Sequence, residues 1–260
     1  MIKLENTEVL GWEAAIRGMR NPMNSWEKSD SIWFDSVDQD IEGTPTNAWY
    51  HDICKEDHAV EPWNVGDDME IGPNDHKLMM NLAKAGSVDA KYRRMIVATV
   101  DITAPLYWWK EFDTYKVGTV ANSCSTMHKI HAKEFTLDDF SCEHLLCVET
   151  YNGDEHDVPC VSYAEQLIRF SPTGVLNVVI DMLNLCRQKF LETKDKRYWW
   201  QMIQLLPSSY NQRRTVMLNY EVLAGIYPKR KNHKLDEWHD FCDWIESLPY
   251  SEIITLEENK

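Results

Sequence analysis

The sequence predicts an α+β protein, because it contains both alternating strand patterns and amphipathic helix patterns. Residues Met95–Thr103 are rich in β-branched residues, which is typical of strands, and Tyr210–Asn219 is predicted to form a second strand. Elsewhere, apolar residues recur at spacings of three and four, which is typical of helices packed on a core. The chain has 260 residues, of which 43% are hydrophobic, so it can form one large domain or two small ones.

The N-terminal third is predicted to contain a short strand and two helices. The first helix covers Trp12–Met19, and we interpret Arg17 and Arg20 as part of its solvated face. The second covers Asp75–Ala85 and ends before a glycine. Between them, Asp35–Glu70 holds eleven carboxylates and one lysine. We interpret it as an ordered insertion that packs on the body or on a neighbouring subunit. An acidic metal site is the alternative, although no spacing matches a calcium loop.

The predicted strand Met95–Thr103 leads directly into a helix. Its inward-facing residues would leave Asp101 on the opposite face; they are Ile96, Ala98, Val100 and Ile102. Pro105 stands where a helix can begin, since its missing N–H is not needed in the first turn. The face of this helix would carry Leu106, Trp109 and Phe112.

After Lys116 the chain becomes rich in small polar residues. We interpret the segment as a loop whose hydroxyl and backbone N–H groups could hold an anion. A Ser/Thr-rich surface loop without a ligand is the alternative. Cys124, His128 and His131 follow closely, but zinc would need a fourth ligand, and we expect no metal. The polar residues of the loop are Thr119, Asn122, Ser123, Cys124, Ser125 and Thr126.

The second half of the chain is predicted to be mainly helical. Thr136 would cap a helix start, with Asp139 as its third residue. An Asn-Gly turn at 152–153 suggests a hairpin within an insertion, Cys142–Val161. Basic residues concentrate in Lys229–Lys234, which we interpret as a solvated helix end or as part of a phosphate site. The predicted helices are Thr173–Leu191, about Lys196–Leu205, and Leu235–Leu248.

The order of strand, Ala104-Pro105, aromatic helix and polar segment resembles the flavin-dependent thymidylate synthase family, ThyX. The signature of that family is Arg-His-Arg-x-x-Ser-x-x-x-x-Ser-x-Arg. Counted without a gap, its two serines fall on Thr119 and Cys124, and its last arginine falls on Thr126. Only Lys116 and Thr119 keep the chemical type. The first three signature positions fall on Thr114, Tyr115 and Lys116.

A second block resembles the family more closely. Leu206-Pro207 is followed, after five intervening residues, by Arg213, and a basic segment with Arg230 lies downstream. In the family, such arginines hold the phosphate and base of deoxyuridylate. The resemblance implies a single ThyX-like domain, 1–260, with helices around an antiparallel-rich sheet and insertions at about 35–72 and 142–161. It implies a nucleotide site at Arg213, Arg230, Thr119, Asn122, Ser123, Cys124 and Ser125, and a former flavin region at Thr114, Tyr115, Lys116, Asn219 and His233.

Composition excludes several other classes of protein. The formal charge of −15 makes a nonspecific hold on a nucleic-acid polymer unfavourable. The seven cysteines form no CxxC pair, and no apolar run is long enough to span a membrane, so we expect reduced thiols and a cytoplasmic protein. The sequence contains no Walker loop, GxGxxG, GxSxG or HExxH motif.

Three functions remain open. The first hypothesis is a ThyX-like protein, by analogy phage-encoded, that holds or sequesters a phosphate-bearing nucleotide without classical flavin catalysis. The second is an active thymidylate synthase that uses FAD to convert dUMP to dTMP. The third is a non-enzymatic interaction protein on the same fold. For the first we expect no cofactor, because Thr114 and Thr126 cannot replace the phosphate recognition of two guanidinium groups. The resemblance also implies a homotetramer.

Overall fold

The computed structural model describes residues 2–33, 64–65, 69–146 and 171–256. Most of the two predicted insertions, including the Asn-Gly turn at 152–153, therefore lies outside the described residues. The chain forms two compact units. The first unit comprises residues 1–2, 103–114 and 123–214, and the second comprises residues 3–102, 115–122 and 215–260. The single-domain expectation stays a prediction.

Five strands form the main sheet, in the order β3-β1-β5-β7-β6. The N–H of Tyr220 donates to the carbonyl of Ile96, and the N–H of Leu106 donates to that of Tyr210, so β5 and β7 run antiparallel. Strands β1 and β3 are parallel, and a separate antiparallel pair joins β2 (Ile32–Trp33) to β4 (Met69–Glu70). The main strands are β1 (Lys3–Leu10), β3 (Asn64–Val65), β5 (Val97–Pro105), β6 (Thr119–Ser123) and β7 (Asn211–Asn219).

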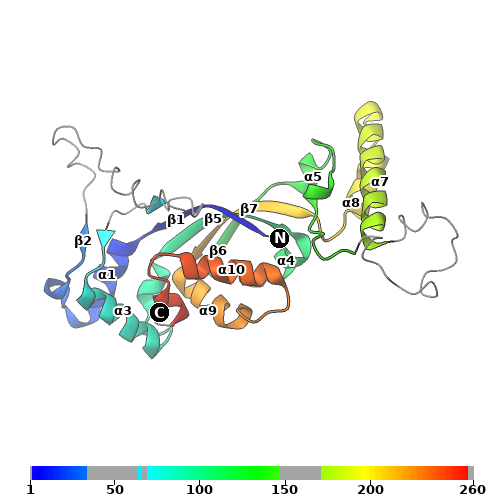
Figure 1. Cartoon of the computed structure of the whole chain (residues 1–260). Coiled ribbons are helices and arrows are strands. Elements are labelled where there is room, and N and C mark those ends of the chain that lie inside the picture. The colour runs from blue at the N-terminus through cyan, green and yellow to red at the C-terminus, as the bar shows by residue number, and fades with distance from the viewer. Residues whose placement is uncertain (1, 34–63, 66–68, 147–170, 257–260) are drawn as a thin grey trace, which may run out of the picture. The chain divides into compact units, whose positions relative to one another are not determined.

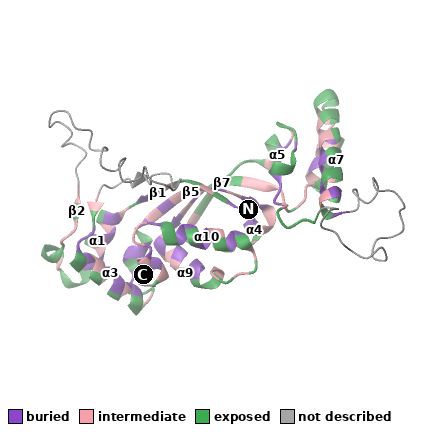
Figure 2. Cartoon of the chain, viewed as in Figure 1, coloured by how far each residue is buried: buried purple, intermediate pink, exposed green. Residues whose placement is uncertain are grey.

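Helices of the second unit lie on one side of its strands (Figure 1). The alternation predicted for β5 is confirmed, since Ile96, Ala98, Val100 and Ile102 are fully buried while Asp101 faces the other way and is half-buried. Buried positions gather on the inner faces of these helices (Figure 2). Their bounds are α1 (Trp12–Arg20), α3 (Pro73–Ala85), α9 (Tyr220–Arg230), α10 (Asp236–Ser247) and α11 (Glu252–Thr255).

The first unit is built around the helical pair α7 and α8. Their predicted positions are confirmed at Pro172–Thr193 and Lys196–Leu205. Two shorter helices belong to the same unit, α4 (Leu106–Phe112) and α5 (Thr126–Lys129). The capping box predicted at Thr136 is also present, although the turn that it opens is a 3-10 turn. The core of the unit contains Ile130, Phe135, Phe140, Leu176, Ile180, Leu183, Cys186 and Met202.

Three expectations about local structure are wrong. Thr119–Ser123 is strand β6 and not a loop, because its backbone joins the edge of the sheet beside β7. Arg20 is not solvated but buried, and its Nε donates to the Asp75 carboxylate at 2.6 Å. Helix α9 follows β7 directly and was not predicted.

In the described part of the chain, no helix is both long and apolar enough to cross a membrane.

α+β is the fold class of the chain, as predicted.

Candidate functional site

The second unit contains a cluster of a cation and aromatic rings at the end of α9. Nε of Arg230, the last residue of the helix, donates to the Tyr115 hydroxyl at 2.9 Å. The guanidinium carbon of Arg230 also lies 4.4 Å from the ring centre of Trp238 and 5.5 Å from that of Tyr115. These contacts fix the guanidinium in one orientation by hydrogen bonding and by cation–π attraction. We call Tyr115, Arg230 and Trp238 the arginine clamp.

Two local features of the sequence build this clamp. Asn219 caps α9, since its side-chain oxygen accepts from the N–H of Val222 at 3.0 Å, and the helix then carries Arg230 to its far end. Trp238 lies in the first turns of α10, where it is fully buried against Phe241. The clamp therefore joins Tyr115 to Arg230 and Trp238, which lie more than a hundred residues further along the chain.

His233 lies next to the clamp. Its ring centre is 6.2 Å from that of Trp238, and its Nδ1 accepts from the N–H of Leu235 at 3.2 Å. The structure thus brings together Tyr115, Arg230 and His233 from the predicted site residues, and it adds Trp238, which the prediction did not include.

The turn before β6 lies against the start of α9. Gly118 has φ +77, and a side chain at this position would come within 2.9 Å of atoms of both Asn219 and Val222. The next residue, Thr119, has a buried hydroxyl without a hydrogen-bond partner among the described residues. Strand alternation places Thr119 and Asn122 on opposite faces of β6, so they cannot line one continuous cradle.

The predicted residues of the first unit lie along β7 and the segment after β6. The Cys124 N–H donates to the carbonyl of Arg213 at 3.0 Å, and the Ser125 hydroxyl accepts from the N–H of His128 and caps α5. The Ser123 side chain is exposed. The Cys124 N–H and the Ser125 hydroxyl are therefore engaged within the fold, and Thr119–Ser123 is a strand. The segment Thr119–Ser125 does not form the predicted anion-binding loop.

Arg213 and Arg214 occupy opposite faces of β7. Arg214 is half-buried: its guanidinium lies 4.1 Å from the ring centre of Trp109 and pairs with the Asp113 carboxylate at 2.7 Å. Arg213 is exposed. The assignment of Arg213 to a ligand site stays a prediction.

The remaining predicted residues have simpler positions. The Thr114 hydroxyl donates to the carbonyl of Glu111 at the end of α4, and the Lys116 side chain is exposed.

Burial and the nearby carboxylates of Asp243 and Glu246 raise the pKa of the Cys242 thiol to about 11, so this cysteine stays protonated near neutral pH. No group of three metal-ligating side chains occurs among residues 2–33, 64–65, 69–146 and 171–256.

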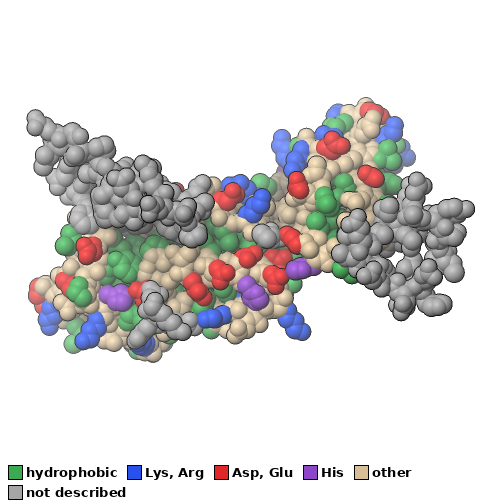
Figure 3. Space-filling model, in the orientation of Figure 1, with side chains coloured by type: hydrophobic (Ala, Val, Ile, Leu, Met, Phe, Trp, Pro, Cys, Tyr) green, Lys and Arg blue, Asp and Glu red, His purple; other side chains and the backbone are tan. Residues whose placement is uncertain are grey.

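Helix α10, which carries Trp238 of the clamp, is rich in acidic residues. Helix α10 carries Asp236, Glu237, Asp240, Asp243 and Glu246, and Figure 3 shows acidic side chains over this surface. Burial, reinforced by neighbouring carboxylates, raises the pKa of Asp240 above its usual value. A polyanion such as a nucleic-acid backbone would be repelled here, whereas one small anion could still reach a single guanidinium.

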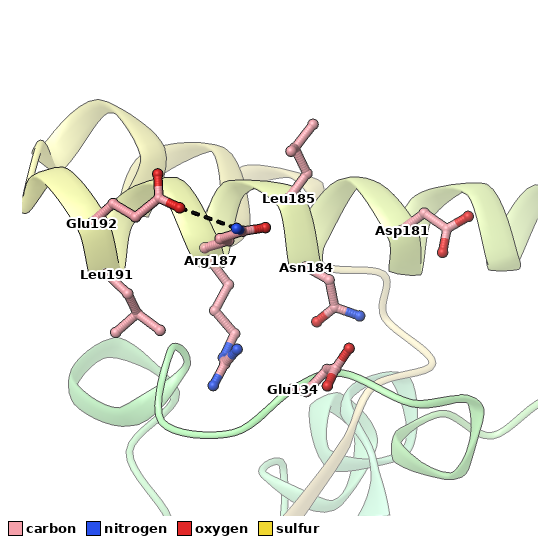
Figure 4. Close-up of a pocket in the computed structure, with 8 residues that line it drawn as sticks. Glu134, Asp181, Asn184, Leu185, Arg187, Leu191 and Glu192 are labelled. Atoms are coloured by element: carbon pink, nitrogen blue, oxygen red, sulfur yellow. Dashed lines mark hydrogen bonds between the residues drawn. The ribbon is translucent and has the colours of Figure 1, made fainter.

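A groove of about 570 Å³ lies in the first unit beside α7, away from the predicted residues. In Figure 4, Arg187 and Glu134 point into the region between α7 and the neighbouring loop. The Arg187 Nε donates to the His131 carbonyl, and the Asn184 amide bonds to both backbone groups of Phe135. These contacts join the loop to the helix. The groove is open and mixed in charge, so we do not assign the nucleotide site to it.

The chain has a ThyX-like fold. Two solved structures of the flavin-dependent thymidylate synthase ThyX from Helicobacter pylori, both with FAD and dUMP, superpose on it with TM-scores of 0.57 and 0.56. Each is 12% identical in sequence; the alignments cover 99% and 98% of this chain and 98% of each ThyX chain. A UMP/dUMP methylase, PolB from Streptomyces cacaoi, aligns with a TM-score of 0.48 at 14% identity over 71% of this chain and 84% of that one, too weakly to support the fold. No protein-family model and no curated protein matches the sequence.

Proposed function

We propose that this chain is a ThyX-like nucleotide-binding protein that holds a phosphate-bearing nucleotide without classical flavin catalysis. The observation that carries the proposal is the arginine clamp: Tyr115 and Trp238 orient the Arg230 guanidinium, which belongs to the basic run Lys229–Lys234 of an otherwise acidic chain. A guanidinium oriented in advance loses less entropy when it binds an anion, and its planar donors match a phosphate group. The fold supports the proposal, because the ThyX structures that share it were solved with dUMP.

Arg213, in the first unit, is a separate candidate for phosphate binding, carried over from the family resemblance. It is the exposed member of the Arg213–Arg214 pair, whereas Arg214 is held against Trp109 and Asp113. We infer that Lys234, at the end of the basic run, contributes long-range attraction and no fixed contact, since its side chain is exposed.

Calorimetry with mono-, di- and cyclic nucleotides tests the proposal. If a nucleotide binds, Arg213→Ala should weaken it by about 2–4 kcal/mol, because a desolvated phosphate loses a charged partner. Lys234→Ala should cost less and mainly reduce the salt dependence. Arg197→Ala is the matched control, since the side chain of Arg197 is 85% exposed and pairs with Asp195. Tight binding that both Arg213→Ala and Arg230→Ala leave unchanged would place the pocket elsewhere.

The alternative is an active FAD-dependent synthase that converts dUMP to dTMP. It is favoured by the FAD in both ThyX structures, so the expectation of no cofactor has no support from the comparisons. The basic residues at the end of α9 suit the phosphates of FAD, but Thr114 and Tyr115 stand where the signature has Arg and His. We therefore expect weak FAD binding. A stoichiometric flavin absorption spectrum in the purified protein would establish the alternative, and a colourless protein that FAD does not titrate would support the proposal.

The homotetramer, the cytoplasmic location and the phage origin stay predictions.

A further inference from the structure

The groove beside α7 contains an arginine that the fold orients but does not pair. Nε of Arg187 donates to the carbonyl of His131 at 3.0 Å, and the side chain is half-buried. Within the described residues, its two terminal nitrogens make neither a hydrogen bond nor an ion pair. A charged side chain that loses part of its water is stabilised when a group of opposite charge replaces that water. The terminal edge of this guanidinium therefore points to a negatively charged ligand.

The neighbouring loop, 131–135, is tied to α7 from both of its ends. The Asn184 amide accepts from the N–H of Phe135 and donates to its carbonyl, both at 2.8 Å, while the carbonyl of His131 is held from the helix as well. The His131 ring packs edge-on against Phe190, with ring centres 4.9 Å apart, and Phe135 is buried in the core of the first unit. The loop therefore keeps a fixed position beside α7, and the two walls of the groove are preorganised.

Glu134 places a negative charge on the loop side of the groove. Its side chain is exposed, lines the groove, and forms no ion pair within the part of the chain that the structure describes. Phe135, the next residue, is bonded to Asn184, which lies about one turn of α7 before Arg187. In Figure 4, Glu134 and Arg187 point into the same region from opposite walls. The two opposite charges therefore lie near each other in the groove without forming an ion pair.

Other lining residues define the two ends of the groove. Leu191 lies about one turn beyond Arg187 and is 38% exposed, so it offers an apolar contact at one end. Asp181, an earlier residue of α7, adds a second carboxylate at the other end. Glu192 is already engaged, because one of its oxygens accepts from the Lys189 ammonium at 3.2 Å. Along α7 the groove thus runs from an apolar contact through a cation to an acidic end.

This order of groups matches a small ligand that carries both charges. A nucleotide phosphate would meet Arg187 but would be repelled by Glu134 and Asp181, and a polyamine would be repelled by Arg187. A zwitterion satisfies both walls, because its carboxylate meets the guanidinium while its ammonium group meets Glu134. The volume of about 570 Å³ lies within the range of small-molecule sites.

We propose that the groove binds a zwitterionic amino acid, or a dipeptide with both ends free, that has an apolar side chain. Arg187 holds the carboxylate through its terminal nitrogens, Glu134 holds the ammonium group, and Leu191 contacts the apolar side chain. All three residues belong to the first unit, whereas the arginine clamp lies in the second. The inference therefore goes beyond the proposed function and does not depend on it.

An NMR titration of the full chain tests the proposal with leucine, leucyl-leucine, N-acetylleucine and leucinamide. Acetylation removes the ammonium charge and amidation removes the carboxylate, while the leucine side chain stays the same. The variants are Arg187→Gln and Glu134→Gln. Their matched controls are Arg197→Gln and Asp138→Asn, because the side chain of Arg197 is 85% exposed, Asp138 is exposed, and both lie in the first unit outside the lining of the groove.

We expect leucine or leucyl-leucine to bind, and N-acetylleucine and leucinamide to bind about tenfold more weakly or worse. Arg187→Gln should abolish the preference over leucinamide, and Glu134→Gln should abolish the preference over N-acetylleucine, while both controls keep both preferences. Glu134 is exposed and its side chain holds no contact of the loop, so this variant decides the question even if Arg187→Gln does not fold.

Absence of binding by both zwitterions at millimolar concentration would overturn the inference, and so would equal binding of all the probes. A preference over N-acetylleucine that survives Glu134→Gln would overturn it too, because the ammonium group would then be held elsewhere. The proposed function is judged by nucleotide binding, so each of these outcomes leaves it standing.

Discussion

Asp75 shows how a single buried carboxylate can organise a segment of chain. Its Oδ2 accepts from the hydroxyls of Ser29 and Ser31, each at 2.7 Å, and from the backbone N–H groups of Asp30 and Ser31. Burial by itself would raise the pKa of Asp75, but the hydrogen bonds from Ser29, Ser31 and Arg20 outweigh it and hold the pKa below the usual 3.8. The network joins α1, the segment before β2, and α3.

Asp75→Asn should destabilise the fold by about 3–5 kcal/mol, because it leaves the buried guanidinium of Arg20 without its charged partner. A folded-state pKa below the unfolded value means that the ionised carboxylate stabilises the fold above about pH 4. That contribution is lost as pH falls through the lower, folded-state value. Urea denaturation of wild type and variant from about pH 2 to about pH 7 would measure both effects.

Glu13→Gln provides the control for this experiment. Glu13 pairs with Arg17 at 3.0 Å on the same helix as Arg20, but both side chains are more than half exposed. The change in unfolding free energy should be within about 0.5 kcal/mol. If Asp75→Asn costs no more than Glu13→Gln, the buried network does not stabilise the fold in the way described.

Tyr115→Phe separates the two contacts that hold Arg230. Phenylalanine keeps an aromatic ring beside the guanidinium but removes the hydroxyl that accepts from Nε. If the clamp binds a nucleotide phosphate, affinity should fall by about 0.5–1.5 kcal/mol, because the guanidinium is less well oriented. The change is measured by calorimetry with the nucleotide that binds wild type. Unchanged affinity, with Arg230→Ala still harmful, would show that the Tyr115 hydroxyl is not needed to orient the arginine.

At the scale of the element, patterns of periodicity predicted the long amphipathic helices well. Helices α7, α8 and α10 begin and end within two residues of their expected positions. Helix α9 was missed, because its buried residues Tyr220, Leu223, Ile226 and Tyr227 are interleaved with other apolar residues and Pro228 lies inside it. Strand β6 was read as a loop, since an edge strand is defined by its neighbour and its own residues carry only a weak signal.

Gly118 couples two of these poorly predicted elements, the turn before β6 and the start of α9. Gly118→Ala should destabilise the protein by about 1–3 kcal/mol, since φ +77 is strained for alanine and the new Cβ would meet the Asn219 side chain. Asn219→Ala should cost about 1 kcal/mol by itself through loss of the helix cap.

The double variant tests whether the two effects are connected. Removing the Asn219 side chain takes away one of the two clashes, so Gly118→Ala should cost less in the Asn219→Ala background than in wild type. Denaturation of the four proteins gives the coupling energy. Strictly additive losses would contradict the close contact between the turn and the helix cap.

At the scale of the whole molecule, the sequence could predict the α+β class, but it could not predict the contacts that form the candidate site. The arginine clamp joins Tyr115, Arg230 and Trp238, and only the tertiary fold brings them together. The degraded signature at Thr114 and Thr126 pointed to a change of ligand chemistry, but strand pairing decides which of its side chains face outward.

Assembly is the last property that the isolated chain predicts. Helix α7 exposes an apolar stripe with spacings of three, four and three, which is the pattern of a helix–helix seam. The exposed fractions are 50% for Val175, 46% for Val178, 44% for Met182 and 50% for Leu185. An antiparallel second copy would place each valine against a Leu or Met, so that small and large side chains alternate across the seam.

The family resemblance predicts a homotetramer, and the α7 seam would join its subunits in pairs. Light scattering at micromolar concentration should show a tetramer for wild type, and the double substitution Met182→Glu with Leu185→Glu should reduce the mass. Charged side chains in the middle of such a seam would have to be desolvated, which opposes association. Val117→Glu is the control, because Val117 is 91% exposed and lies in the second unit, outside the stripe. Circular dichroism should show that each variant remains folded. A monomeric wild type, or a tetramer indifferent to both glutamates, would remove α7 as the contact between copies.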